Sequence, residues 1–375
     1  MKKPYIITAI LAASASSSIS AVEFSANLGV GQDSNPHHLS DQFSPDSELF
    51  AKARFKSHSN IAELFYWGVD VDKTLYPDDK RAESFNVEAD LKFQHDFDLW
   101  ETNYQYFVGL DYQHFDKTFV SKQTGAVATI NGVSLADRYD HDDKGYYLGI
   151  GFSSSETFDY RFSYIVDERD YVDFSVPNID RLDYEDNTFQ FDLNLNTLND
   201  GFFYLNLGYR NRFFIERNDR DFEGNVIVDS ALEYNDVIAN LGYVYQPDEN
   251  TRWEYVFNFV NRYSNGTDYY ESERARIEIN ADYRLADYHI ITSQLAYQTY
   301  FFDDDFDQPY EFMEEDQIEK RGFKFKIEYT WVLATLFKTN LGLFANLEAR
   351  IYDSPDDIFD YEQHQINMGI RWAMD

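Results

Sequence analysis

The stretch ARIEINADYRL, residues 275–285, alternates apolar and polar side chains without a break. A period of two indicates a β-strand with one apolar and one polar face, because successive side chains of a strand point to opposite sides. A helix would repeat its apolar residues every three or four positions. The same alternation recurs in SFNVEADLKF (84–93) and GFKFKIEYTW (322–331). The chain is therefore predicted to be all-β.

About 16 alternating segments follow one another, and the connections between them are alternately long and short. The long connections are acidic and rich in turn-forming residues, as in residues 116–143 and 302–321. A membrane barrel has this asymmetry, whereas a soluble sandwich does not. A spanning sheet must also close, since an open edge leaves backbone groups unpaired in hydrocarbon. The segments are predicted to start near Val22, Leu49, Leu64, Phe85, Trp100, Tyr146, Phe158, Thr188, Phe203, Asn235, Trp253, Arg274, Ile291, Gly322, Thr339 and His364.

Aromatic residues make up 18% of the chain, with 30 Tyr and 33 Phe. Many lie in the apolar phase beside short connections, such as Tyr245 and Trp253, and such residues favour the interface between headgroups and hydrocarbon. Aromatics are also common in soluble strands, so their phase and position carry the prediction. The last segment, HQINMGIRWAMD (364–375), resembles the closing strand of outer-membrane proteins. We predict a transmembrane antiparallel outer-membrane β-barrel of about 16 strands, with short periplasmic turns and long acidic extracellular loops.

The first 21 residues have the pattern of a secretory signal peptide. Lys2 and Lys3 precede the apolar run YIITAILAA (5–13), and small residues lead to a predicted cleavage after Ala21. The apolar run is shorter than the ~20 residues that a spanning helix needs. The predicted organisation is a signal peptide, 1–21, and one transmembrane β-barrel domain, 22–375. The predicted location is the outer membrane of a Gram-negative bacterium.

Charge and cysteine content exclude several classes of function. The net charge of −35 argues against binding nucleic acid through bulk electrostatics. The chain has no Cys, so it has neither disulfides nor thiol chemistry. No constellation of Ser and His or of Asp and His identifies a catalytic centre. We predict a protein that is not an enzyme and needs no cofactor.

The polar phase of the strands, expected to face the lumen, carries both signs of charge. These residues are candidates for contact with a transported solute, or they form cross-strand ion pairs that hold the wall together. Inward aromatics such as Phe107, Tyr147, Tyr204 and Tyr300 could stack on sugar rings or pack beneath a loop. The connection 116–143 is a candidate to fold inward and form a constriction. The predicted lumen and transport residues are Lys52, Arg54, Arg210, Arg212, Arg276, Lys324, Lys326, Glu88, Asp90, Glu278 and Tyr204.

The acidic run that contains Asp303, Asp304 and Asp305 concentrates oxygen atoms suited to hard cations. These three residues are weak candidates for divalent-cation ligands. The run lacks the glycine spacing of an EF-hand, and a solvated acidic surface explains it as well. Divalent cations would also bridge such loops to the phosphates of lipopolysaccharide.

The first loop begins with GVGQDSNPHHLSD, residues 29–41. Gly31, Asp33, Ser34, Asn35 and Pro36 form a Gly-x-Asp-Ser-Asn-Pro sequence that resembles the opening of Gram-negative barrel proteins of the β-barrel porin, exopolysaccharide-export-associated type. That family usually carries Tyr before the Asp and Phe after the Pro, where this chain has Gln and His. The resemblance implies transport or secretion of saccharide. The alternative is a turn that ends the strand, since Pro lacks the ladder donor.

Three functions remain open at this point. The first is an outer-membrane barrel that passes a hydrophilic solute, with saccharide as the expected class, by exopolysaccharide export or oligosaccharide passage. The second is a general or cation-preferring diffusion porin. The third is a plugged surface or adhesive barrel. The expected partners are outer-membrane lipid, lipopolysaccharide, the barrel assembly machinery and saccharide, with no nucleic acid; the sequence leaves the oligomeric state open.

Overall fold

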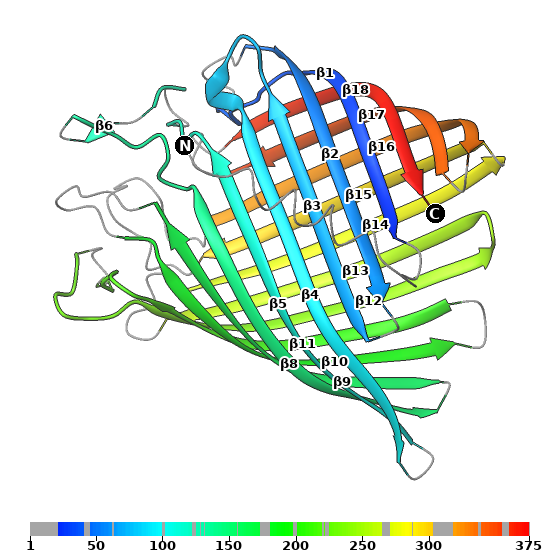
Figure 1. Cartoon of the computed structure of the whole chain (residues 1–375). Coiled ribbons are helices and arrows are strands. Elements are labelled where there is room, and N and C mark those ends of the chain that lie inside the picture. Colours follow the sequence, from blue (N-terminus) through cyan, green and yellow to red (C-terminus); the bar gives the residue numbers. More distant parts are fainter. Residues whose placement is uncertain are drawn as a thin grey trace.

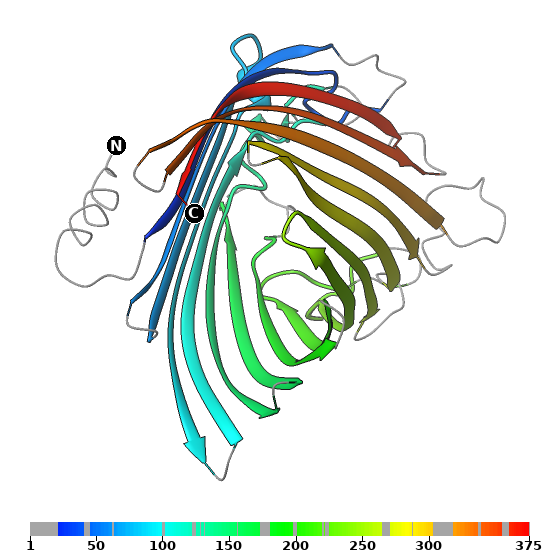
Figure 2. The ribbon, with the colours of Figure 1, turned by 90° about the vertical axis from the view of Figure 1, so that its right-hand side faces the viewer.

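Sixteen antiparallel strands form one closed ring in the computed structural model of the chain (Figure 1, Figure 2). Each strand pairs with its neighbours in chain order, and β1 pairs with β18 to close the ring. The structure describes residues 22–40, 46–61, 64–99, 102–121, 125–127, 129–130, 132–155, 157–172, 181–197, 201–219, 221, 225–264, 271–286, 288–302, 318–336, 339–354 and 360–374. In this part of the chain, no helix is long and apolar enough to cross a membrane.

The barrel strands are β1 (Glu23–Asp33), β2 (Glu48–Ile61), β3 (Phe65–Leu75), β4 (Ser84–Leu99), β5 (Thr102–Lys117), β8 (His141–Ser155), β9 (Phe158–Tyr171), β10 (Tyr184–Thr197), β11 (Gly201–Phe214), β12 (Glu233–Asp248), β13 (Thr251–Ser264), β14 (Ser272–Ala286), β15 (His289–Phe302), β16 (Ile318–Leu336), β17 (Thr339–Asp353) and β18 (Tyr361–Met374). A small hairpin, β6 (Thr129–Ile130) and β7 (Val133–Ser134), and a short 3-10 helix, η2 (Lys80–Ala82), lie in connections. The predicted antiparallel barrel of about 16 strands is confirmed. The strands are 11 to 19 residues long.

The two faces of each strand differ as the alternation predicts. Large apolar side chains such as Leu28, Leu148 and Met368 are 58–64% exposed on one face. The other face is the concave, inner one, because its side chains reach across an intervening strand. Arg371 on β18 contacts Glu328 on β16 at 2.6 Å in this way. The barrel is therefore apolar outside and charged inside.

Inward aromatic rings lie across glycines of the neighbouring strand. A Cβ atom added to Gly109 would lie 2.1 Å from Cζ of Tyr147, and one added to Gly242 would lie 2.0 Å from Cζ of Tyr204. Only glycine leaves room for such a close approach. These tyrosines therefore cover the backbone of the neighbouring strand inside the wall.

The Asp-Ser-Asn-Pro segment fastens the seam between the first and last strands. Asp33 is 1% exposed, and its carboxylate accepts bonds from Tyr76 (2.9 Å), Gln363 (2.9 and 3.0 Å) and Gln365 (3.1 Å). The side-chain amide of Asn35, which is fully buried, donates to the carbonyl oxygens of residues 39 and 362. The segment thus joins β1, the loop after β3 and β18.

The described residues of the connection between β5 and β8 contact the first two long loops. Arg81 donates to the carbonyl oxygen of Gly125 at 3.0 Å and binds Asp79, whose pKa it lowers. Figure 1 shows β6 beyond the strand ends. At the end of this connection, Asp140 accepts the backbone N–H of Lys117 at 2.8 Å. Burial raises the pKa of Asp140 to about 6, and two neighbouring carboxylates contribute.

Candidate functional site

Ion pairs line one part of the inner wall. Lys52 pairs with Asp72 at 3.1 Å on adjacent strands, and Arg54 pairs with Asp70 at 2.6 Å. The register places both pairs diagonally across β2 and β3, because Asp72 is directly opposite Arg54 and Asp70 is directly opposite Lys56. The side chains of the two cations remain 40% exposed. This exposure indicates that the lumen at their level is accessible to water.

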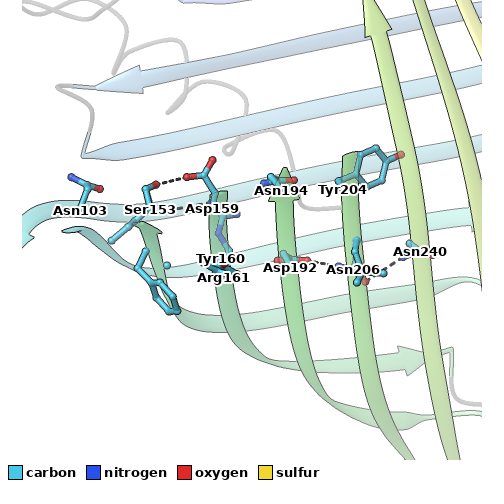
Figure 3. Close-up of a pocket in the computed structure, with 14 residues that line it drawn as sticks. Asn103, Ser153, Asp159, Tyr160, Arg161, Asp192, Asn194, Tyr204, Asn206 and Asn240 are labelled. Atoms are coloured by element: carbon cyan, nitrogen blue, oxygen red, sulfur yellow. Dashed lines mark hydrogen bonds between the residues drawn. The ribbon is translucent and has the colours of Figure 1, made fainter. Parts of the chain in front are cut away.

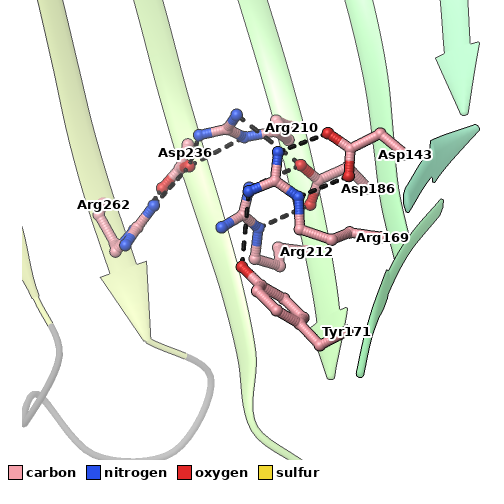
Figure 4. A network of polar contacts seen from close by, with 8 residues as sticks. All are labelled: Asp143, Arg169, Tyr171, Asp186, Arg210, Arg212, Asp236 and Arg262. Atoms are coloured by element: carbon pink, nitrogen blue, oxygen red, sulfur yellow. Dashed lines mark hydrogen bonds and ion pairs between the residues drawn. The ribbon is translucent and has the colours of Figure 1, made fainter. Parts of the chain in front are cut away.

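A denser network spans β8 to β13 (Figure 4). Asp236 is completely buried and accepts bonds from Arg262 (2.9 and 3.1 Å) and Arg210 (3.0 Å to Nε). Arg212 binds Asp186 through two bonds of 2.8 Å each. The predicted candidates Arg210 and Arg212 thus lie together, two residues apart on the inner face of β11. Their guanidinium groups belong to one network rather than standing free.

Aromatic faces support these arginines. The guanidinium carbon of Arg212 lies 3.8 Å from the ring centroid of Tyr184, and that of Arg262 lies 4.6 Å from the ring of Tyr234. Both tyrosines belong to a buried cluster with Phe214 and Leu232, near the ends of β10–β12 that carry the long connections. Stacking on an aromatic face fixes a planar guanidinium in one orientation.

A second group of charges lies on β14 to β18. Arg276 binds Glu278, while Glu348 accepts from Arg350 at 2.6 Å and lies 3.7 Å from Lys324. Lys326, two residues further along β16, lies directly opposite Glu348 in the register. It lines the same inner face as the others. The predicted candidates on this side are therefore mostly paired within the wall.

Four inward carboxylates on β4, β5 and β9 form no salt bridge within 4 Å in the described part of the chain: Glu88, Asp90, Asp111 and Asp167. Glu88 accepts only from amides, at 2.8 Å from Asn86 and 3.3 Å from Gln113. In the order of strands around the ring, these four carboxylates lie roughly opposite β16, which carries Lys324 and Lys326. Among the predicted candidates, Glu88 and Asp90 belong to this acidic group.

An amide-rich cavity of about 600 Å³ opens on the inner face of β5 and β8–β12 (Figure 3). Across three adjacent strands, Asn206 donates to Asp192 at 2.5 Å, and Asn240 donates to Asn206 at 3.3 Å. Tyr204 lines the cavity and donates to Glu254 at 3.2 Å. Arg161 donates to Gln105 at 3.2 Å beside it. Such a surface presents several donors and acceptors at short intervals.

The amides of this cavity are not among the lumen residues predicted from the sequence. Asn103, Gln105, Asn194, Asn206 and Asn240 occupy the polar phase of their strands, so the alternation could have placed them inside. Nothing in the sequence indicated that they gather on one part of the wall. The register between strands decides that arrangement.

Two groups of predicted residues remain, the cation-ligand candidates and the sugar-stacking aromatic residues. Asp303, Asp304 and Asp305 lie outside the described residues. Within the described ranges, no group of three or more His, Cys, Asp and Glu has the arrangement of a metal site. Of the proposed sugar-stacking rings, Phe107 lies over Gly149 and Tyr147 over Gly109, while Tyr300 lies near the guanidinium of Arg274.

No protein-family model matches the chain, and no curated protein matches it by sequence. Solved structures resemble it in overall shape. In-vitro folded OmpT, an outer membrane protein of Vibrio cholerae, is 10% identical, with a TM-score of 0.45 over 96% of this chain and 99% of that chain. An anion-selective porin from Comamonas acidovorans is 10% identical, with a TM-score of 0.43 over 94% and 99%. OccAB3 of Acinetobacter baumannii is 12% identical, with a TM-score of 0.44 over 95% and 100%. At such low identity the similarity concerns the barrel fold alone.

Proposed function

We propose that the chain forms a water-filled diffusion channel for small hydrophilic solutes in the outer membrane. One observation carries this proposal: the closed ring is apolar on its outer face and lined with ion pairs on its inner face. A soluble barrel has the opposite polarity, since its outer face meets water. A ring of 16 strands is also wide enough to enclose an aqueous channel.

The exposure of the inner cations supports an open lumen rather than a packed one. The side chains of Lys52, Arg54 and Lys56 are 40–47% exposed although they face inward. A plugged barrel would bury such charges, and burying them costs several kcal/mol per ion unless each is fully paired. The adhesive or structural barrel is therefore the weaker alternative.

Within this function, we propose saccharide as the class of solute that passes the channel, and the amide-rich cavity supports this proposal. Sugars present vicinal hydroxyls that both donate and accept, and the side chains of Asp192, Asn206 and Asn240 offer matching partners in one row. Tyr204 adds a phenol and a ring at the same cavity. Exopolysaccharide export remains a prediction from the resemblance alone. The residues that carry that resemblance serve barrel closure in this structure.

The charge pattern favours a modest preference for small cations at low salt. The whole chain is strongly acidic, and four inward carboxylates, Glu88, Asp90, Asp111 and Asp167, form no salt bridge among the described residues. Exposed charges are screened over about 10 Å at 0.1 M salt, so the preference should fade as ionic strength rises. We also propose that divalent cations link the acidic loops to lipopolysaccharide. The barrel assembly machinery is the proposed route of insertion into the membrane.

Single-channel current through the purified barrel in a planar bilayer tests the proposal. We expect steady conductance, and a neutral oligosaccharide should block it transiently. Changing Asn206 and Asn240 to leucine should weaken that block, whereas Asn280→Leu, an inward amide outside the cavity, should not. Conductance without sugar block would leave a plain diffusion channel. An absence of conductance would refute the channel.

A further inference from the structure

A row of carboxylates crosses the inner wall from β4 to β10. Asp90 is directly opposite Asp111, and Asp167 is directly opposite Asp186. Gly145 pairs with both Asp111 and Asp167 and supplies no side chain between them. The carboxylate of Asp111 leans over this glycine, where an added Cβ would lie 2.1 Å from Oδ2.

Like charges directly opposite one another on a sheet repel, so this row is unfavourable by itself. Arg212 neutralises Asp186 at one end. Among the residues that the structure describes, Asp90, Asp111 and Asp167 form no salt bridge within 4 Å, although the guanidinium of Arg210 acts on Asp167 from a greater distance. A positively charged group in the cavity that Asp111 and Asp167 both line would relieve the repulsion.

The other side of the same cavity carries three arginines together with their carboxylate partners. A cavity of about 440 Å³ is lined both by the carboxylate row and by Arg169, Arg210 and Arg212. Figure 4 shows the guanidinium groups of these arginines close together beside Asp143 and Asp186. Each has a carboxylate partner, but their clustering leaves N–H groups beyond those used in the ion pairs. The two bonds from Arg212 to Asp186 use Nε and Nη2, which leaves Nη1.

We propose that this cavity is a binding site for zwitterionic solutes, with an ammonium group held by Asp111 and Asp167 and a carboxylate held at the arginine cluster. Neither charge alone suits the cavity: a simple cation leaves the arginine donors unused, and a simple anion meets the carboxylate row. Charge-assisted hydrogen bonds at both ends would orient an amino acid or similar molecule across the cavity, from the carboxylates to the arginines. The site opens to the lumen, so access to it rests on the proposed function.

Equilibrium dialysis with the detergent-solubilised barrel tests binding without requiring conductance. Three radiolabelled probes of similar length separate the charges: 4-aminobutyrate carries both, 4-amino-1-butanol only the ammonium, and 4-hydroxybutyrate only the carboxylate. We expect 4-aminobutyrate to bind about tenfold more tightly than either of the others, the change that one charge-assisted hydrogen bond provides.

Removing the ammonium side should abolish that preference. The double variant Asp111→Asn, Asp167→Asn removes two neighbouring like charges that form no salt bridge in the described structure, so it should fold at least as well as the parent. Its affinity for 4-aminobutyrate should fall about tenfold. Asp282→Asn removes one lumen charge on β14, outside the cavity, and should leave binding unchanged.

Three outcomes separate this inference from the proposed function. Equal binding of 4-aminobutyrate and 4-amino-1-butanol would reduce the site to a simple cation site and overturn the proposal. No saturable binding by a conducting barrel would overturn the proposal and leave the channel standing. Selective binding by a barrel that does not conduct would support the site and refute the channel.

Discussion

Replacing Asp236 with asparagine removes the charge that holds two arginines. Asp236 is completely buried, while the side chains of Arg210 and Arg262 are 25% and 27% exposed. Losing the partner of a fully buried ion costs about 3–5 kcal/mol. About a quarter of each arginine side chain is exposed, so water can replace part of the lost interaction. We therefore expect a loss of about 1–1.5 kcal/mol for each arginine, at or just below the lower end of the range for a charge-assisted hydrogen bond. The expected loss is therefore about 2–3 kcal/mol in the free energy of unfolding.

Urea unfolding of the barrel in lipid vesicles, followed by the fluorescence of its five Trp residues, measures this loss. Asp192→Asn is a matched control, since Asp192 also faces the lumen but accepts bonds from Gln190 and Asn206 rather than from arginine. The control should lose less than about 1 kcal/mol. If Asp236→Asn and the control agreed within about 0.5 kcal/mol, the arginine network would not stabilise the wall as argued.

Three further predictions concern the outer face, the orientation and a loop. Ile279→Arg on the apolar face should cost about 2–4 kcal/mol of folding free energy in lipid, and Asn280→Arg on the inner face much less; equal costs would contradict the assigned phase. An epitope at Gly132 should be labelled on intact cells and one at Asn250 should not, because they lie at opposite ends of the barrel; the reverse pattern would invert the orientation. Because the pKa of Asp140 is raised to about 6, the folded connection holds the proton more tightly than the unfolded chain does. The resulting stability is fully present below about pH 4, the ordinary pKa of Asp, and it is lost as the pH rises through 6. Hydrogen exchange should show weaker protection of that connection at pH 7 than at pH 4, and Asp140→Asn should flatten the difference; an unchanged pH profile in the variant would exclude Asp140 as the cause.

The ion-pair network shows where prediction of the site from sequence stops. The alternation placed Arg210 and Arg212 on the inner face, and the structure agrees. It could not name their partners, because Asp236 and Asp186 are each 26 residues away along the chain. A shift of one residue in strand register would turn every side chain of a strand to the other face, so pairing depends on the whole ring.

The sequence by itself determined the strands, their two faces and their approximate number, since a period of two is a local property of each segment. Only the tertiary structure decided which side chains meet. Asp33 bonds to Gln363, 330 residues away, because closing the ring brings the two chain ends together. The carboxylate row of Asp90, Asp111 and Asp167 likewise exists only through the registers of β4, β5, β8 and β9. Contacts between distant segments depend on closure and register, and no local pattern encodes either.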